Sequence, residues 1–270
     1  MNLQTPPNVL TIAGSDSGGG AGIQADIKTM SALGVYSTSV ITSVTAQNTC
    51  KVAAIHPVPA PVVKAQLNSV FEDFEIKTVK IGMLGESDVI DVVADMLEHF
   101  GPLPIVLDPV MVATSGDRLI NKKAIDKLKS RLFPLATLLT PNLPEAAALL
   151  NEEEASSLDE MKHQALALST LGANNILLKG GHHKGSDCID LLLSNQVFHV
   201  FKNTKIDTRN THGTGCTLSS AITAKLALGQ TLEQAVAESI TYVRSAIHNA
   251  DTLNAGKGHG PLHHFFASWT

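Results

Sequence analysis

Residues 9–45 read VLTIAGSDSGGGAGIQADIKTMSALGVYSTSVITSVT, and this segment is the most informative one about the fold class. Two runs rich in β-branched residues, 9–13 and 38–45, flank a segment with helical character at 21–33. A glycine-rich turn follows the first run, and Gly34 ends the helical segment. A strand, a helix and a second strand in this order form a β-α-β unit, whose two strands lie parallel in one sheet.

The same alternation continues along most of the chain. Further strands are predicted at residues 78–81, 104–107, 137–140 and 175–179, and helices at 61–74, 87–100, 124–132, 145–150, 158–171, 215–228 and 232–250. Residues 187–193 and 196–201 are joined by Ser194-Asn195, which predicts a β-hairpin. We therefore predict an α/β fold with a mainly parallel central sheet, helices on both faces and an antiparallel edge.

Composition limits the classes of protein that fit. The 270 residues contain no long Pro/Gly/Ser linker, so we expect a single domain over residues 1–270. A net charge of −5 argues against nucleic acid as a partner, and no uninterrupted apolar run of about 18 residues predicts a membrane span. The start MNLQTPPNVL is unlike a signal peptide, and the three cysteines form no C-x-x-C pair, so we expect a cytoplasmic protein.

Residues 210–217, NTHGTGCT, precede a helix of small residues and predict an anion-binding turn. The first N–H groups of a helix have no partner inside it and lie at the positive end of its dipole. Gly213, Thr214 and Gly215 would bring these groups close to a phosphate or a developing oxyanion. Cys216 lies in the first turn, where a helix N-terminus lowers the pKa of a thiol. The alternative is an ordinary helix start with a small buried cysteine.

The chain also resembles a known family through an ordered set of motifs. These are AGSDSGGGAGIQAD (13–26), VTAQN (44–48), KIGML (80–84), LDPVMV (107–112), TPNLPE (140–145), LKGGH (178–182) and THGTGC (211–216). The set resembles the hydroxymethylpyrimidine/phosphomethylpyrimidine kinases of thiamine biosynthesis, in the ribokinase-like superfamily. The resemblance implies a ribokinase-like fold, a homodimer, and ATP and Mg²⁺ as cofactors. It also implies a small-molecule substrate, 4-amino-5-hydroxymethyl-2-methylpyrimidine, which is phosphorylated twice in succession.

The resemblance assigns roles at the phosphate end of the site. Cys216 would be the base that deprotonates the acceptor alcohol, or it would only line the pocket. Gly213, Thr214 and Gly215 would hold the transferred phosphoryl group, and Thr211 would lie beside the ATP. Lys179 follows a buried strand and would bind the ATP phosphates; alternatively, it reaches solvent from the strand end.

Three residues are metal candidates. The resemblance assigns Asn142 and Glu145 to Mg²⁺, through waters. By itself the N-x-x-E spacing is a helix-capping pattern, which is the alternative. Asp108, directly after the strand at 104–107, is a third candidate near the metal and the phosphates.

The acceptor ring needs hydrogen bonds at its edge and apolar contacts on its faces. Gln47 has both a donor and an acceptor, and Asp26 could accept from the exocyclic amine. Met83 and Val110 would cover the ring, although a lone methionine is more often part of a core. Gly14 follows the first strand at the same edge of the sheet. Residues 111–118, MVATSGDR, would form a lid that excludes water.

Three other functions remain open from the sequence. Pyridoxal kinases share the fold and some share the cysteine-type turn, but Gln47 and Met83 favour an aminopyrimidine. A nucleotide-binding oxidoreductase would use the turn at 14–22, which lacks the G-x-G-x-x-G spacing. A catalytically silent binding protein would not need Lys179, Glu145 and Cys216 together.

Overall fold

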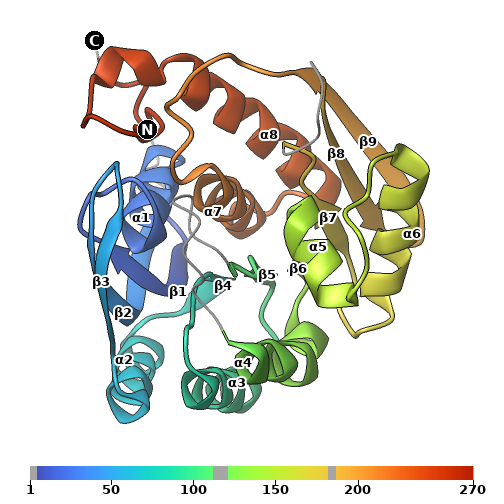
Figure 1. The fold of residues 1–270 in the computed structure, drawn as a ribbon. Coiled ribbons are helices and arrows are strands. Elements are labelled where there is room, and N and C mark those ends of the chain that lie inside the picture. Colours follow the sequence, from blue (N-terminus) through green and yellow to red (C-terminus); the bar gives the residue numbers. More distant parts are fainter. Residues whose placement is uncertain (1–4, 112–120, 182–186, 270) are drawn as a thin grey trace.

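The computed structural model describes residues 5–111, 121–181 and 187–269. Its nine strands form one sheet in the order β3-β2-β1-β4-β5-β6-β7-β8-β9 (Figure 1). The strands are β1 (Asn8–Asp16), β2 (Tyr36–Gln47), β3 (Val52–Pro57), β4 (Ile76–Ile81), β5 (Ile105–Leu107), β6 (Leu138–Leu139), β7 (Ile176–Leu178), β8 (Asp187–Ser194) and β9 (Val197–Thr204). Strands β2, β1, β4, β5, β6 and β7 are parallel, while β3, β8 and β9 each pair antiparallel with their neighbour.

Helices cover both faces of this sheet. They are α1 (Gly22–Ala32), α2 (Ala60–Asp73), α3 (Ser87–Phe100), α4 (Lys122–Lys127), α5 (Leu143–Leu150), α6 (Leu158–Ser169), α7 (Thr214–Ala227) and α8 (Leu232–His248). Buried residues of α2 to α6 share one hydrophobic cluster, and those of α7 and α8 share another. Helix α1 packs with α7 on the second face. No helix among the described residues has the length and apolar character needed to cross a membrane.

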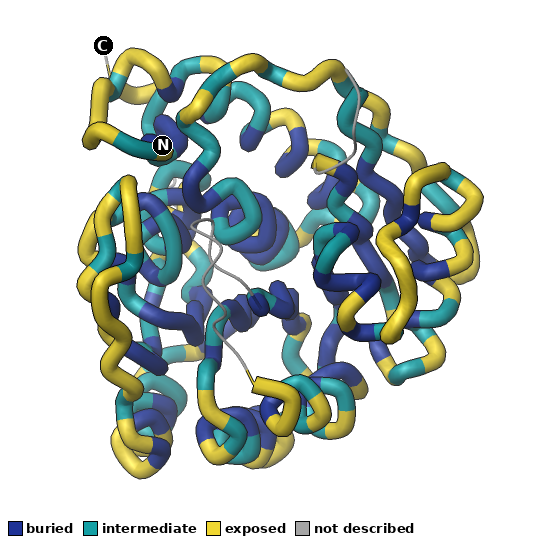
Figure 2. The backbone as a smooth tube through the Cα atoms, in the orientation of Figure 1, coloured by how far each residue is buried: buried dark blue, intermediate teal, exposed yellow. Residues whose placement is uncertain are grey.

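The two clusters lie on opposite faces because side chains alternate along a strand. In β5, Ile105 and Leu107 belong to the larger cluster and Val106 to the other. Both faces of the central strands are therefore buried, as expected for a parallel sheet between helices. Figure 2 shows buried residues concentrated in the central strands and in α7.

Most of the predicted elements are confirmed. The predicted hairpin forms, but its turn residues are Asn195 and Gln196, one position later than predicted, with positive φ angles (50° and 65°) that are typical of a type I′ turn. Three further details differ. Strand β1 continues through the first glycine to Asp16, and the predicted helix at 124–132 begins at Lys122 and becomes a π-helix over Leu128–Leu132. Strand β3 was missed because it lies at an edge and is mostly exposed, so it lacks an alternating apolar pattern.

The parallel strands place their carboxyl ends along one edge of the sheet. In an open α/β sheet ligands bind at this edge. Residues 112–120, which include most of the predicted lid at 111–118, lie outside the described residues, while Met111 is buried.

Candidate active site

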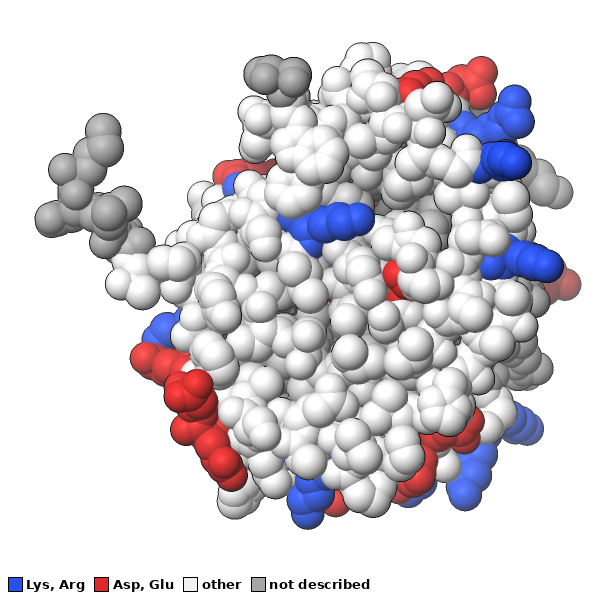
Figure 3. All heavy atoms as spheres, turned by 90° about the vertical axis from the view of Figure 1, so that its left-hand side faces the viewer, with Lys and Arg blue, Asp and Glu red and all other residues white. Residues whose placement is uncertain are grey.

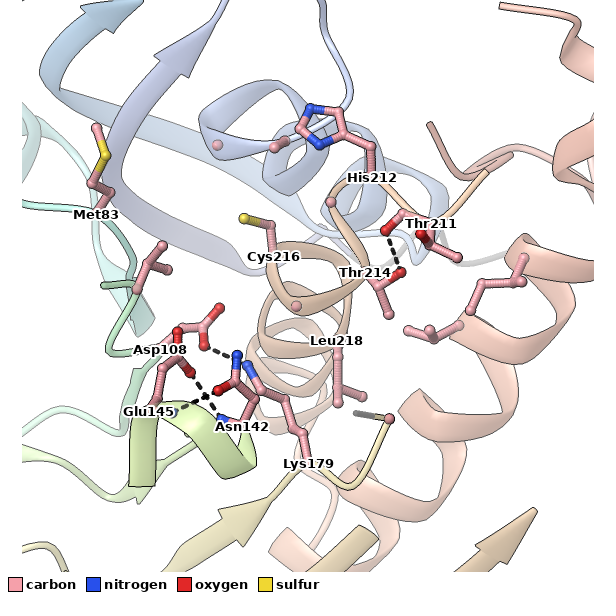
Figure 4. Close-up of a pocket in the computed structure, with 18 of the residues that line it drawn as sticks. Met83, Asp108, Asn142, Glu145, Lys179, Thr211, His212, Thr214, Cys216 and Leu218 are labelled. Atoms are coloured by element: carbon pink, nitrogen blue, oxygen red, sulfur yellow. Dashed lines mark hydrogen bonds and ion pairs between the residues drawn. The ribbon is translucent and has the colours of Figure 1, made fainter. Parts of the chain in front are cut away.

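A cavity of about 780 Å³ lies at the carboxyl ends of the parallel strands and reaches the start of α7 and one side of α8. The predicted site residues that line it are Gly14, Gln47, Met83, Asp108, Val110, Asn142, Glu145, Lys179, Thr211, Gly213, Thr214, Gly215 and Cys216. Residues from seven distant segments of the chain therefore meet in one place (Figure 4). Their individual roles stay predictions.

The start of α7 has the backbone conformation that an anion site needs. Gly213 has a φ of 83°, and a Cβ there would lie 1.8 Å from the carbonyl oxygen of Gly20, so only glycine fits. Thr214 donates from Oγ1 to the carbonyl oxygen of Thr211 at 2.7 Å and thereby ties the turn to the helix. Helix geometry leaves the first-turn N–H groups of Gly215 and Cys216 without an acceptor inside α7, and both residues line the cavity.

Lys179 forms an ion pair beside this turn. Its Nζ donates to Oδ1 of Asp108 at 2.7 Å, and the Asp108 side chain is only 2% exposed. Burial opposes the lysine charge, but Asp108 and Glu145 outweigh it and raise the pKa of Lys179. A Cβ on Gly215 would lie 3.3 Å from Nζ, so the glycine lets this cation approach the helix start. Lys179 is thus a buried, charged lysine at the cavity wall.

Asn142 and Glu145 form the capping box of α5. Glu145 N–H donates to Oδ1 of Asn142, and Asn142 N–H donates to Oε2 of Glu145, each at 2.8 Å. The capping alternative is therefore confirmed.

Among the described residues, no group of three or more His, Cys, Asp and Glu side chains is arranged to hold a metal. Two carboxylates and an amide do fit Mg²⁺, which keeps several waters and needs one or two carboxylates.

The raised pKa of Glu145 predicts that the stability of the protein falls as pH rises. Burial raises the pKa of Glu145 from 4.5 to about 7, Lys179 lowers it, and Asp108 raises it further. Between these two pH values the unfolded chain releases a proton that the folded protein retains, so this group's contribution to stability is lost as pH rises from 4.5 to 7.

We expect the Glu145→Gln variant to lack this loss. At about 1.4 kcal/mol for each tenfold change in proton affinity, wild type should lose on the order of 2–3 kcal/mol relative to the variant between pH 5 and pH 8. Urea unfolding of both proteins at the two pH values measures the difference. Parallel pH profiles would contradict the assignment.

The structure contradicts the predicted low pKa of the Cys216 thiol. Burial, together with the carboxylates of Asp26 and Asp108, raises the pKa of Cys216 to about 11, although Lys80 and a hydrogen bond from the Gly22 N–H lower it. The helix N-terminus is outweighed because the sulfur has lost most of its water. In the protein without bound ligands Cys216 is therefore a thiol at neutral pH.

The structure does not place Asp26 where it could contact the substrate amine as predicted. The side chain is 0% exposed, and Lys80 donates to both of its oxygens, at 3.0 and 2.8 Å. Thr11 and Ser220 also donate to this carboxylate, each at 2.6 Å. Asp26 therefore lies beneath the cavity floor, and Lys80 lines the cavity in its place. Sequence analysis missed this lysine, because the strand IKTVKI also contains the exposed Lys77 and nothing in the sequence distinguishes the two.

The end of the cavity next to β1 and β2 is built around Gly14. A Cβ there would lie 2.6 Å from Cε of Met83 and 2.8 Å from Oγ of Ser43, so the absence of a side chain makes room for the methionine. Met83 is partly exposed to the cavity rather than part of the core. Two further residues that line this end, Asp16 and His212, were missed; both lie inside the glycine-rich motifs that the sequence already indicated.

The opposite end has both apolar and polar lining residues; α8 contributes most of the apolar ones, and Asn203, Lys205 and Arg244 are among the polar ones. Its apolar lining residues are Ile206, Leu218, Ile240, Val243 and Ile247. The glycines of the loop at 256–260 lie against Thr49 and Asn210. The amphipathic pattern of α8 could not reveal this face, because apolar residues lining a pocket and apolar residues in a core look alike in sequence.

A parallel α/β sheet, a glycine turn opening a helix at its carboxyl edge, and a buried lysine with carboxylates define a phosphotransferase-type site. The sequence profile described as phosphomethylpyrimidine kinase matches residues 16–263, and the chain belongs to this family. It is 51% identical over 260 residues to a hydroxymethylpyrimidine/phosphomethylpyrimidine kinase of Rhizobium meliloti, covering 96% of this chain and 97% of that protein.

Two further relatives are informative. A bifunctional thiamine biosynthesis protein of Geobacter sulfurreducens is 48% identical over 97% of this chain, which spans 53% of that protein. The crystal structure of an ADP complex of Bacillus subtilis pyridoxal kinase superposes with a TM-score of 0.90 at 32% identity, covering 98% of this chain and 100% of that one. The predicted α/β ribokinase-like fold and kinase family are therefore confirmed.

Proposed function

We propose that this protein phosphorylates 4-amino-5-hydroxymethyl-2-methylpyrimidine and then its monophosphate, with ATP as donor, in thiamine biosynthesis. One observation carries the proposal beyond family membership. The start of α7 lies between an acceptor end, with Gln47 and Met83, and an opposite end along α8, within a single cavity. A phosphoryl group held at the α7 turn would face the acceptor on one side and the nucleotide on the other.

The reaction is an in-line transfer, so the protein mainly positions the reactants and neutralises charge. Backbone N–H groups of the Gly213–Gly215 turn and Nζ of Lys179 hold the phosphoryl oxygens. Cys216 faces the acceptor end and takes the proton of the hydroxymethyl group as that oxygen attacks. Because Cys216 is a thiol at neutral pH, it first releases its own proton to solvent, and the nearby positive charge of Lys80 favours this ionisation.

Asp108, Asn142 and Glu145 would hold Mg²⁺, directly or through waters. The bound ion would neutralise charge on the phosphate oxygens. Because Lys179 already pairs with Asp108, the same carboxylate would orient the lysine and the ion toward one phosphate chain.

Turnover of defined acceptors tests the proposal. Wild-type protein is incubated with ATP and Mg²⁺ and with hydroxymethylpyrimidine, its monophosphate or pyridoxal, and the products are followed by phosphorus NMR. We expect the pyrimidine to give first the monophosphate and then the diphosphate. Turnover of pyridoxal alone would overturn the assignment in favour of the second candidate, which the similarity to the Bacillus pyridoxal kinase supports.

The β2–β3 edge supports a homodimer, which we also propose. Tyr36, Val44 and Ile55 are 52%, 49% and 42% exposed, and Figure 3 shows that the face on this side is largely uncharged, with charged side chains mostly at its margins. A second copy of the chain would cover this apolar surface. Wild type should then sediment as a dimer, whereas Ile55→Lys should sediment as a monomer; a monomeric wild type would contradict the proposal.

Two further proposals concern the domain organisation and the location of the protein. We propose that the chain forms one domain and that the protein is cytoplasmic. A single sheet that runs from Asn8 to Thr204 supports the first. The three cysteines are all free, which is typical of a reducing compartment and supports the second.

A further inference from the structure

His212 connects the two glycine turns of the site. Its Nε2 lies 2.9 Å from Oδ2 of Asp16, and a Cβ on Gly20 would lie 2.5 Å from its Cδ2. The imidazole therefore packs directly on the turn that follows β1, while its own chain continues into Gly213 and α7. Figure 4 shows His212 at the start of α7, on the side of the N-terminal elements.

Asp16 can only accept hydrogen bonds from His212. The backbone N–H groups of Gly18, Gly20 and Ala21 donate to its oxygens at 2.7, 3.0 and 2.9 Å, and its side chain is 3% exposed. Burial opposes its charge, but His212 and these N–H groups outweigh burial and lower the pKa of Asp16. An ionised carboxylate has no proton to give, so Nε2 of His212 carries the hydrogen.

Gln47 meets the same ring nitrogen with its amide. As placed, Nε2 of Gln47 lies 3.3 Å from Nε2 of His212, and two donors face each other. Rotating the amide by 180° exchanges atoms of nearly identical size, so hydrogen bonds alone decide between the two orientations. In the rotated amide Oε1 faces this N–H, which is donated mainly to Asp16 at 2.9 Å and is shared with Gln47 at the longer distance of 3.3 Å.

Thr45 requires the same rotation independently. Its single hydroxyl proton is donated to the carbonyl oxygen of Ser15 at 2.9 Å, and the amide of Gln47 lies 3.2 Å from the same hydroxyl oxygen. That oxygen can therefore only accept from Gln47, which places the NH₂ group toward Thr45. Two partners on opposite sides of the amide select one orientation.

We infer that Asp16, His212 and Thr45 form a positioning set that fixes the Gln47 amide with its oxygen toward His212 and its NH₂ toward Thr45. The consequence of this inference rests on the proposed function. The set fixes which side of the Gln47 amide offers a donor and which offers an acceptor to the pyrimidine ring of the substrate. An aminopyrimidine offers an acceptor nitrogen next to a donor amine, and an amide of one orientation can pair with both. His212 is thus a specificity-determining residue that acts through Gln47.

A double-mutant cycle tests the coupling. We expect His212→Leu to raise the KM for hydroxymethylpyrimidine about 10- to 100-fold, with kcat changed less than about threefold and the KM for ATP unchanged. His212→Gln, which places an amide donor near the lost nitrogen, should recover most of the loss. In a Gln47→Ala background, His212→Leu should add less than about twofold. Additive losses, or a fall in kcat without a change in this KM, would overturn the inference.

A second measurement needs no variant. In wild-type protein the side-chain NH₂ protons of Gln47 should show nuclear Overhauser contacts to Thr45 and not to the His212 ring; the reverse pattern would overturn the inference. This result is independent of catalysis. Absence of pyrimidine turnover by wild type would overturn the proposed function, while the NMR contacts would still decide the amide orientation.

Discussion

Cys216→Ala should lower the rate of the first phosphorylation by about 10²–10⁴-fold and that of the second by less than about tenfold. The two acceptors differ in their need for a base. The hydroxymethyl group must lose a proton as it attacks, whereas a phosphate ester with a second pKa of roughly 6 is already mostly deprotonated at neutral pH. A residue that acts as a base is therefore needed in one step only.

Single-turnover assays with each acceptor measure the two rates separately. Cys50→Ala is the matched control, because Cys50 is an exposed free cysteine that lies outside the cavity lining. Equal losses in both steps would show that the sulfur orients the phosphoryl group or the acceptor instead. The raised pKa of Cys216 makes this a demanding test, since the thiol must release its own proton before it can act as a base.

Lys179→Met should reduce kcat/KM for ATP by about 10²–10³-fold, the usual loss when one charge-stabilising donor is removed from a reacting group. The same substitution leaves the buried Asp108 carboxylate without its ion-pair partner, which costs about 3 kcal/mol of stability. Activity and stability therefore fall together in this variant, and a second variant is needed to separate them.

Lys179→Met with Asp108→Asn separates the two effects. The double variant should regain most of the lost stability, because the remaining amide carries no charge, but its kcat/KM for ATP should stay well below that of Asp108→Asn alone, which lacks the same proposed metal ligand. Chemical unfolding and steady-state kinetics measure the two quantities. Lys162→Met, which removes a lysine from an exposed pair with Asp159, should change neither. Recovery of activity together with stability would show that Lys179 serves only to hold the fold.

Local patterns in the sequence were enough to predict most of the strands and helices and a mainly parallel sheet with an antiparallel edge. The β-α-β unit at residues 9–45, the helix at 87–100 and the β8–β9 hairpin each depend on residues that lie close together in the chain. The same is true of the glycine turn before α7, whose conformation depends on Gly213 itself. A parallel sheet then places the ends of its strands at one edge, so the position of the cavity also followed.

The pairing of charges could not be predicted in this way. Asp26 meets Lys80 across 54 residues and Ser220 across 194, so no local pattern shows that its carboxylate is already satisfied. Cys216 has the sequence of an activated thiol, yet its proton affinity depends on how much water and which carboxylates the folded chain leaves around it. His212 and Asp16 are likewise 196 residues apart.

The sequence by itself determined most of the strands and helices, the glycine turn before α7 and the family to which the chain belongs. These are properties of short segments, because backbone conformation responds mainly to neighbouring residues. Only the tertiary structure decided which charged groups face the cavity, which are neutralised beneath it, and which side chains surround the Gln47 amide. Solvation and Coulomb interactions act through space, so they are set by neighbours that only the folded chain brings together.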